Sequence, residues 1–528
     1  MRRLLAFAVI ALLVAGFIFR FGQLEHKVFW IDETFTALRV SGYDESEVVA
    51  YFQAHPLLTA ADLQQFQTYS ADNGASDTIQ GLARYEPHLP PAYFLLVREW
   101  AHWFGSSPGV IRSFSAVVGL LSLLGIYLLA VELFKNKRAG WIAATLMAIS
   151  PFHVLYSQEA RPYSLWTLTL LGSSWLFLRA VRLNRLREWW LYAIAVTLAL
   201  YTFLFSIFFV LGNTLYLLVQ TRNRRIYRRY LIFTSIAIAS FIPWLLIIWQ
   251  YRQQSFQVVE WALKSSATSR WGQLLAWGLH FTRAFVDFEQ TYPFNSTHLW
   301  PYLLVVLSIW GLVGYACYDL WYHAEPRAWQ WLVCLIATPA VGLILLDLWV
   351  GGEFGRTTRY VVPCLIGAEL AVAFCLANQT SPLRSQERRK VWMWILVGVY
   401  SLGTLSCASG VFAVSGWHKS GGYIPYVAAA INQTPQPLVI SDFDLWILSL
   451  SHYLKPTTVV EMFDSTRALP PVPEGFSHYF LVNAPPGFVQ TWATQSDYQF
   501  LPFEQLDQVP AWCMQIASQP KTCPPFSS

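Results

Sequence analysis

Long apolar runs separated by short basic stretches occupy the first 413 residues of the chain. A helix of roughly 17–25 mostly apolar residues can cross the hydrocarbon core of a membrane. The run from Trp189 to Leu218 exceeds one span, so we divide it at the polar-aromatic region Tyr201–Ser206. The pattern therefore predicts an all-α polytopic membrane protein with about eleven transmembrane helices. The predicted spans are approximately 4–22, 109–134, 140–157, 162–181, 189–204, 206–220, 230–249, 299–318, 329–350, 360–378 and 391–413.

One apolar segment, Pro91–Phe104, is too short to cross and carries Arg98, Glu99 and His102. We interpret it as a helix lying in the membrane interface. The basic residues then test the layout, because Lys and Arg are enriched in cytoplasmic loops. With eleven spans and a cytoplasmic N-terminus, all five basic clusters fall on the cytoplasmic side. These clusters are Arg2/Arg3, Lys135/Lys137/Arg138, Arg179/Arg182/Arg185/Arg187, Arg222/Arg224/Arg225/Arg228/Arg229 and Arg384/Arg388/Arg389/Lys390.

The tail, residues 414–528, is mostly polar and is predicted to lie outside the cytoplasm. Short apolar strings at 437–441 and 478–482 predict buried strands, and 423–431 and 446–454 predict helices. We therefore expect two domains: a transmembrane domain over 1–413, including an outer loop at 23–108, and a small C-terminal α/β domain over 414–528. Cys513 and Cys523 lie in the tail, and a disulfide between them is one open possibility.

Composition agrees with a multi-pass membrane protein, which we expect to lie in the cell (inner or plasma) membrane. The chain is 55% hydrophobic and 13% charged, whereas soluble domains carry about 25% charged residues. The net charge of +5 does not indicate nucleic-acid binding, because the basic residues sit between apolar runs. None of the seven cysteines has C-x-x-C spacing, so we propose no zinc or redox site.

The sharpest candidate for chemistry is the acidic pair Asp32 and Glu33, in the string Trp30–Thr34 just after the first span. At a membrane–water boundary, desolvation raises a carboxyl pKa and a nearby cation lowers it. Asp32 could therefore act as a base toward an acceptor hydroxyl, with Glu33 orienting it. The alternative is a solvated acidic pair that favours a helix N-terminus.

A second polar string, Tyr156–Tyr163, joins two predicted spans on the same outer face as Asp32. Its tight turn places Glu159 and Arg161 at the boundary, where Arg161 could bind a phosphate. The alternative is a turn whose arginine reaches lipid headgroups.

A third string, Arg84–Pro91, leads into the interfacial helix, and its prolines restrict the entry angle. Glu86 and His88 would be presented at the interface with Tyr93 behind them, as substrate-binding candidates or as structural residues.

A fourth string, Gly351–Tyr360, also lies outside, where Arg356 and Arg359 could bind a lipid phosphate. Asp347 at the end of a span and Glu369 nearer the membrane centre are candidates because ionisable residues are costly there. Glu369 could instead pair with another span.

Four polar strings from separate parts of the chain are thus predicted on one side of the membrane, beside an apolar interface. An enzyme with a lipid-linked substrate needs such a combination, because cations stabilise a departing lipid phosphate.

The strings Trp30–Thr34, Pro90–Pro91 and Tyr156–Tyr163 resemble the C-type polytopic glycosyltransferases, in the branch of protein O-mannosyltransferases and lipid A aminoarabinose transferases. The resemblance covers residues 1–220 well, is looser over 221–413 and does not include the tail. It implies a polyprenyl-phosphate-linked sugar donor and inverting transfer on the extracytoplasmic face to a lipid, glycan or protein acceptor. It also implies Asp32 as base with Glu33 beside it, and phosphate binding by Arg161 and by Arg356 or Arg359. Tyr163 and Glu159 belong to the same candidate set. Family members often carry His-Pro-Pro, whereas this chain has His88-Leu89-Pro90-Pro91.

Three alternatives use the same residues differently. A transporter or flippase of lipid-linked sugars would use the intramembrane charges for passage, but it should show matched broken helices or inverted repeats. A scaffold or sensor would act through the tail, and a polymer ligase would not need the Asp-Glu pair. We expect no cofactor, and two neighbouring carboxylates are too few ligands to argue for a divalent metal.

Overall fold

The computed structural model describes residues 2–516 except 222, 259–269, 289–298, 351, 443–444, 465–472, 485–486, 496–497 and 503–510. These residues form two compact units. The helical unit comprises 1–24, 82–96 and 112–413, and the sheet unit comprises 25–81, 97–111 and 414–528. These bounds differ from those of the two predicted domains, because much of the first outer loop belongs with the tail.

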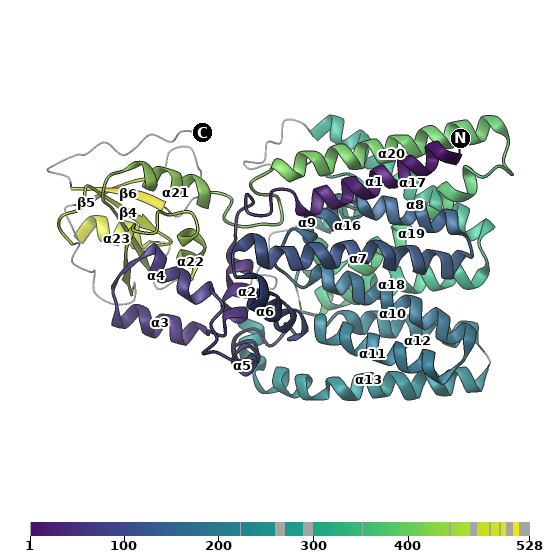
Figure 1. Ribbon diagram of the computed structural model, residues 1–528, viewed down its shortest axis with the longest axis horizontal. Coiled ribbons are helices and arrows are strands. Elements are labelled where there is room, and N and C mark those ends of the chain that lie inside the picture. Colours follow the sequence, from purple (N-terminus) through teal and green to yellow (C-terminus); the bar gives the residue numbers. More distant parts are fainter. Residues whose placement is uncertain are drawn as a thin grey trace. The chain divides into compact units, whose positions relative to one another are not determined.

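Long apolar helices make up most of the helical unit, and in Figure 1 they run along one common direction. Each predicted span overlaps at least one α-helix, and the span at 140–157 is divided between two. In the described part of the chain, six helices are long and apolar enough to cross a membrane: α7, α13, α17, α18, α19 and α20. The helices of this unit are α1 (Arg2–Phe21), α7 (Pro108–Phe134), α8 (Lys137–Ala148), α9 (Pro151–Ser157), α10 (Tyr163–Leu183), α11 (Leu186–Thr202), α12 (Ser206–Gln220), α13 (Arg224–Gln250), α14 (Arg252–Val258), α16 (Arg270–Arg283), α17 (Leu299–His323), α18 (Pro326–Val350), α19 (Val362–Gln379) and α20 (Gln386–Phe412).

The prediction of one continuous helix over 140–157 is wrong, because this segment is divided into α8 and α9. α8 and α9 meet at a bend of 58° around Ile149 and Ser150, and the pair counts as a seventh candidate span if taken together. Pro151 begins α9 and explains the break. Proline has no N–H for the helix ladder and disfavours helical geometry at the residue before it.

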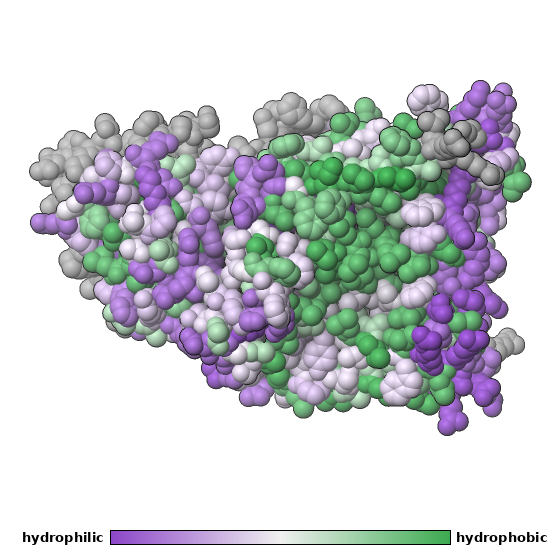
Figure 2. Space-filling model, in the orientation of Figure 1, coloured by the Kyte–Doolittle hydropathy of each residue, from purple (hydrophilic) through white to green (hydrophobic). Residues whose placement is uncertain are grey.

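Three of the basic clusters, those containing Lys135, Arg182 and Arg229, lie at one end of the helical unit. Figure 2 shows hydrophilic side chains gathered at that end, on the right of the view, beyond the apolar surface of the long helices. Glu132 links two of the clusters, since it binds both Lys135 at 2.8 Å and Arg182. Arg229 donates to Asn184 Oδ1 at 3.0 Å and so joins α13 to the turn between α10 and α11. These contacts place three clusters that are distant in sequence on the same side.

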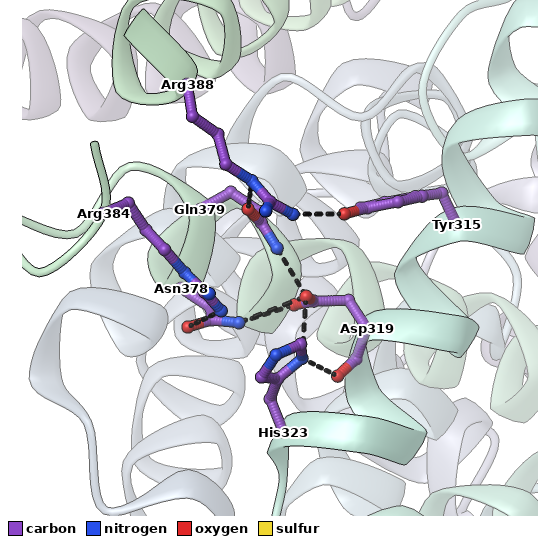
Figure 3. A network of polar contacts seen from close by, with 7 residues as sticks. All are labelled: Tyr315, Asp319, His323, Asn378, Gln379, Arg384 and Arg388. Atoms are coloured by element: carbon purple, nitrogen blue, oxygen red, sulfur yellow. Dashed lines mark hydrogen bonds and ion pairs between the residues drawn. The ribbon is translucent and has the colours of Figure 1, made fainter. Parts of the chain in front are cut away.

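A network of seven polar side chains joins α17, α19 and α20 at their polar ends (Figure 3). Fully buried Asp319 accepts hydrogen bonds from Asn378 at 2.9 Å and from Gln379, and His323 Nδ1 lies 3.1 Å from its Oδ1. Arg388 donates to Gln379 Oε1 at 2.8 Å. Tyr315 and Arg384 complete the network. A buried carboxylate surrounded by donors ties these helices together in one arrangement.

Glu369 has a partner on another helix, the second of the two roles considered for it. Its Oε1 lies 3.3 Å from Nε2 of His153 on α9, and both side chains are buried. Arg20 is fully buried too and donates to the carbonyl oxygens of Ala148 at 2.7 Å and Met147 at 2.9 Å. Arg20 therefore satisfies carbonyl groups that the break after α8 leaves exposed.

The sheet unit has six strands in the order β1-β3-β2-β4-β6-β5. β2 pairs in parallel with β3 and β4, and the other pairs are antiparallel. β2 and β4 occupy the two predicted strand positions, and α21 and α22 the two predicted helices. The described strands are β1 (Leu57–Thr59), β2 (Pro437–Asp442), β3 (Val459–Phe463), β4 (His478–Val482), β5 (Tyr498–Pro502) and β6 (Ala511–Ile516). The helices are α2 (Ile31–Ser41), α3 (Glu45–Ala54), α4 (Ala60–Gln64), α21 (Ile424–Gln433), α22 (Trp446–Ser451) and α23 (Phe488–Gln495), with α5 (Ala75–Tyr85) and α6 (Ala92–Phe104) shared between the units.

Both faces of the sheet are covered, because alternate strand residues pack into two separate cores. On β2, Val439 joins the core that includes α2 and α21, while Leu438 and Ile440 join the core around Trp492 of α23. This alternation is the two-residue period of a strand buried on both faces. The first outer loop contributes β1, which pairs with β3 and makes loop and tail one folding unit.

α6 is 13 residues long, so at about 1.5 Å per residue it cannot cross the membrane. This agrees with the interpretation of 91–104 as a non-crossing helix. Cys513 on β6 is disulfide-bonded, while Cys317, Cys334, Cys364, Cys375 and Cys407 are free. The expected partner, Cys523, lies outside the described residues.

Glu461 on β3 makes the stability of the sheet unit depend on pH. Burial raises the pKa of its carboxyl to about 7, and no described residue hydrogen-bonds its Oε2. The folded state thus prefers the protonated form, so its contribution to stability is present at acidic pH and is lost as pH rises through about 7. We predict that the Tm in detergent rises on acidification from about pH 8 to about pH 5, and that Glu461→Gln flattens this rise. The exposed Glu474→Gln serves as control, and an equal slope in wild type and Glu461→Gln would contradict the prediction.

Candidate functional site

The two acidic residues of the first outer loop have different environments, although they are adjacent. Both lie in the first turn of α2, which begins after Trp30 without a side-chain cap. Carboxylates are favoured there by the partial positive charge of the helix N-terminus. Asp32 is half-exposed, whereas Glu33 is fully buried. Successive helical residues point about 100° apart, so one carboxylate faces outward while the other faces the core.

Glu33 forms a buried ion pair with a residue of the tail. Lys419 Nζ lies 2.7 Å from Glu33 Oε2, and the side chains are 1% and 0% exposed. The same ammonium donates to the carbonyl oxygen of Val28 at 3.0 Å. The ion pair gives Glu33 a structural role, and Asp32 is the less buried carboxylate of the two.

The segment before α2 is anchored to the tail at several further points. The N–H of Val28 donates to the carbonyl of Val414 at 2.8 Å. The N–H of Phe29 donates to the hydroxyl of Tyr453 at 2.6 Å, and the hydroxyl of Ser449 donates to the carbonyl of Phe29. These bonds hold the backbone that leads into α2, and with it the starting position of Asp32.

The turn Tyr156–Tyr163 in the helical unit is buried. Glu159 is fully buried and Arg161 is 5% exposed. Gln158 donates to the carbonyl oxygens of Phe19 at 2.7 Å and Gly22 at 2.8 Å, so the turn is fixed to the end of α1. This burial argues against the alternative in which Arg161 reaches out to lipid headgroups.

Arg359 meets the same turn through an aromatic side chain. Its guanidinium carbon lies 5.6 Å from the ring centre of Tyr163 and 5.7 Å from that of Tyr360. The ring of Tyr163 packs edge-on against Tyr156 at 5.1 Å. Two of the predicted polar strings, Tyr156–Tyr163 and 351–360, therefore come together inside the helical unit.

Asp347 holds the backbone of the loop that carries Arg356 and Arg359. Its two carboxylate oxygens accept the N–H groups of Phe354 at 2.7 Å and Gly355 at 2.8 Å. A Cβ atom at position 355 would lie 2.8 Å from Asp347 Oδ2, so any other residue there would push this carboxylate aside. Asp347 was a candidate because an ionisable residue is costly at the end of a span. Its two hydrogen bonds to the loop backbone give it a structural role there.

A hydrogen-bonded chain fixes the same loop from the other side. His280 on α16 contacts the carbonyl of Gly355 through Nε2 and the hydroxyl of Thr358 through Nδ1, both at 2.9 Å. Burial lowers the pKa of His280 to about 3, so the ring is neutral at physiological pH. A carbonyl only accepts, so Nε2 carries the proton and Nδ1 accepts from Thr358. The Thr358 oxygen in turn accepts from Arg283 at 2.9 Å.

The remaining candidates have mixed surroundings. Arg356 is 40% exposed and forms an ion pair with Glu353. Glu86 is buried and His88 is half-buried, and the carbonyl of Pro87 accepts from Trp244 at 3.0 Å. Tyr93 is fully buried and its hydroxyl lies 2.9 Å from that of Ser115, which favours a packing role.

Sequence reasoning missed Lys419 and His280. Lys419 follows the last span by a few residues and lies in no motif, so only its isolation in the weakly charged stretch 391–431 could have drawn notice. His280 lies in a segment without a clear periodic signal. In the described part of the chain, no group of three or more His, Cys, Asp or Glu residues is placed to hold a metal ion.

Thr358→Val should loosen the loop that carries Arg356 and Arg359. The change removes a hydroxyl that both donates to His280 and accepts from Arg283, so we expect a loss of about 1–3 kcal/mol of stability. Faster hydrogen exchange over residues 352–360 and a lower Tm in detergent would be measured together. Thr357→Val, at the half-buried neighbouring threonine, should change neither the hydrogen exchange of this loop nor the Tm. Equal effects of the two variants would contradict the contacts assigned to Thr358.

Comparisons with known proteins give a consistent result. Residues 88–249 match the family profile described as dolichyl-phosphate-mannose-protein mannosyltransferase. The chain is 23% identical over 338 residues to the undecaprenyl phosphate-alpha-4-amino-4-deoxy-L-arabinose arabinosyl transferase of Pseudomonas savastanoi pv. phaseolicola. That match includes 62% of this chain and spans 58% of the length of the curated relative.

Two solved structures share the fold over nearly the whole length. ArnT from Cupriavidus metallidurans in the apo state matches with a TM-score of 0.54 and 12% identity, over 98% of this chain and 99% of that chain. ArnT bound to undecaprenyl phosphate matches with a TM-score of 0.51 and 13% identity, over 97% and 98%. The family profile, the curated relative and the shared fold all fit a C-type membrane glycosyltransferase.

Proposed function

We propose that this chain is a membrane glycosyltransferase that moves a sugar from a polyprenyl-phosphate-linked donor to a lipid, glycan or protein acceptor, with inversion at the anomeric carbon. The proposal rests on the different environments of the two adjacent carboxylates, Asp32 and Glu33. Lys419 neutralises Glu33, while Asp32 stays half-exposed beside it. The donor class is supported by the undecaprenyl phosphate named for the curated relative and for the bound ArnT structure.

In the proposed reaction, Asp32 takes the proton of the acceptor nucleophile as that atom attacks the anomeric carbon of the donor. The bond between this carbon and the phosphate oxygen breaks, and its electron pair leaves with the lipid phosphate. Arg161 and Arg359 stabilise the charge that develops there, because guanidinium groups bind phosphate with charge-assisted hydrogen bonds. Arg356 is a weaker candidate, since Glu353 already binds it.

The other candidates take supporting roles in this proposal. Tyr163 orients Arg359 through its ring face. Glu159 lies in the same turn as Arg161, where it can set the position of that turn. Glu86 and His88 remain substrate-binding candidates, and Tyr93 is kept only as a residue that supports them.

We further propose that eleven helices cross the membrane and that the end carrying the basic clusters faces the cytoplasm. The linked clusters around Glu132 and Arg229 support one common basic side, as the positive-inside bias requires. The N-terminus would then be cytoplasmic, and the sheet unit would be a C-terminal extracytoplasmic domain joined by the first outer loop. A flippase of lipid-linked sugars is the alternative, and the family profile favours transfer over transport.

Asp32→Asn should lower the rate of sugar transfer by at least about 100-fold, because it removes the general base. The rate is measured as incorporation of labelled sugar from total lipid-linked donors into membrane acceptors. Asp72→Asn makes the same chemical change at an exposed position of the same outer loop and should be neutral.

A near wild-type rate in folded Asp32→Asn would show that the base is elsewhere. If Asp32→Asn instead blocks movement of the lipid-linked sugar across vesicle membranes, with no transfer in wild type, the flippase alternative is correct.

A further inference from the structure

A groove of about 510 Å³ lies beside the turn that joins α12 to α13. It belongs entirely to the helical unit and is separate from the residues assigned to sugar transfer. Its lining consists of Leu218, Thr221, Asn223, Arg224, Tyr227, Arg228, Leu231 and Ile232.

The lining changes character along α13. Arg224 and Arg228 are four residues apart, so they share one helix face. Leu231 and Ile232 follow Arg228 by three and four residues and continue that face toward the helix centre. None of the eight lining residues is acidic. The groove therefore has a cationic half at the helix end and an apolar half deeper along the helix.

The apolar half is open to the surroundings of the protein. Leu218 is 59% exposed, and Leu231 and Ile232 are 43% and 45% exposed. The cationic half lies at the start of α13, which in Figure 1 is at the right-hand end of the helical unit, and Figure 2 shows hydrophilic side chains gathered at that end. In a membrane this end of α13 coincides with the level of lipid phosphates, because α13 is one of the helices long and apolar enough to cross.

The two neighbouring arginines, Arg225 and Arg229, do not line the groove, so its cationic half is formed by specific residues of this helix end. Arg229 is held in the fold by Asn184, whose Oδ1 accepts from it at 3.0 Å. Arg225 is exposed and does not line the groove. Only Arg224 and Arg228 therefore face the groove among the described basic residues of this stretch.

We propose that the groove binds an anionic phospholipid, with the headgroup phosphate between Arg224 and Arg228 and the upper acyl chain against Leu218, Leu231 and Ile232. The two cations are opposite in sign to the headgroup phosphate, and Tyr227 lies between them along the helix. A free phosphate would leave the apolar half uncovered, and a zwitterionic lipid would bring its own cation to the arginines. The ligand is thus a structural lipid and does not depend on the proposed transferase reaction.

Native mass spectrometry of the full-length protein in detergent tests the proposal. Phosphatidylglycerol is titrated against phosphatidylcholine of equal chain length. Each arginine should contribute about 1 kcal/mol, or about fivefold in affinity, so Arg224→Gln/Arg228→Gln should weaken phosphatidylglycerol binding by about 25-fold. Arg225→Gln is the matched control and should change it less than twofold. Leu231→Ala should weaken the binding of phosphatidylglycerol but not that of glycerophosphoglycerol, which has the same headgroup phosphate and no acyl chains.

Three results would overturn the proposal. Equal loss in Arg225→Gln and in the double variant would mean diffuse attraction by the basic end. Equal binding of phosphatidylcholine would remove the charge requirement. Displacement of the lipid by inorganic phosphate at similar concentration would show that the site is a phosphate site and that the apolar half contributes nothing. All four arginine and leucine positions in these variants are exposed, so the folded state is expected to persist, and the Tm in detergent checks this.

Discussion

The buried ion pair between Glu33 and Lys419 fixes the start of α2, where Asp32 lies. Two charges out of water are tolerated only when each neutralises the other and the remaining donors are satisfied. Lys419 is neutralised by Glu33 and also donates to the carbonyl of Val28. The tail therefore cannot release the start of α2 without leaving a charge buried alone. Asp32, one residue away, is less buried because Glu33 is the carboxylate that packs against Lys419.

The loop of the helical unit that carries Arg356 and Arg359 is also held by buried polar contacts, in this case hydrogen bonds to its backbone. Asp347 accepts two successive backbone N–H groups, and neutral His280 joins Gly355 to Thr358. Arg359 then packs on Tyr163, in the string that also carries Arg161. In the proposed reaction, preorganised cations of this kind would stabilise the departing phosphate without reorganisation.

The sequence was sufficient for features that depend on local periodicity. The long apolar helices, the strands near 437–441 and 478–482 and the short helix after Pro91 all come from such patterns. Features that depend on pairing across the chain were not predictable. β1 is three residues long and has no strand signal of its own, yet it moves the first outer loop into the sheet unit. Lys419 finds Glu33 across 386 positions. Pro151, in contrast, was visible, and the break before it could have been predicted.

The most direct test is a double-mutant cycle at Glu33 and Lys419, read out by unfolding in detergent and by sugar transfer. Glu33→Gln and Lys419→Met should each cost about 3–5 kcal/mol, because each leaves one buried charge unpaired. The double variant should recover much of this loss and retain transfer well above that of Asp32→Asn, which should itself cost less than about 1 kcal/mol of stability. Additive losses in the double variant, or a destabilisation by Asp32→Asn as large as that by Glu33→Gln, would contradict the assignment of Glu33 as anchor and Asp32 as base.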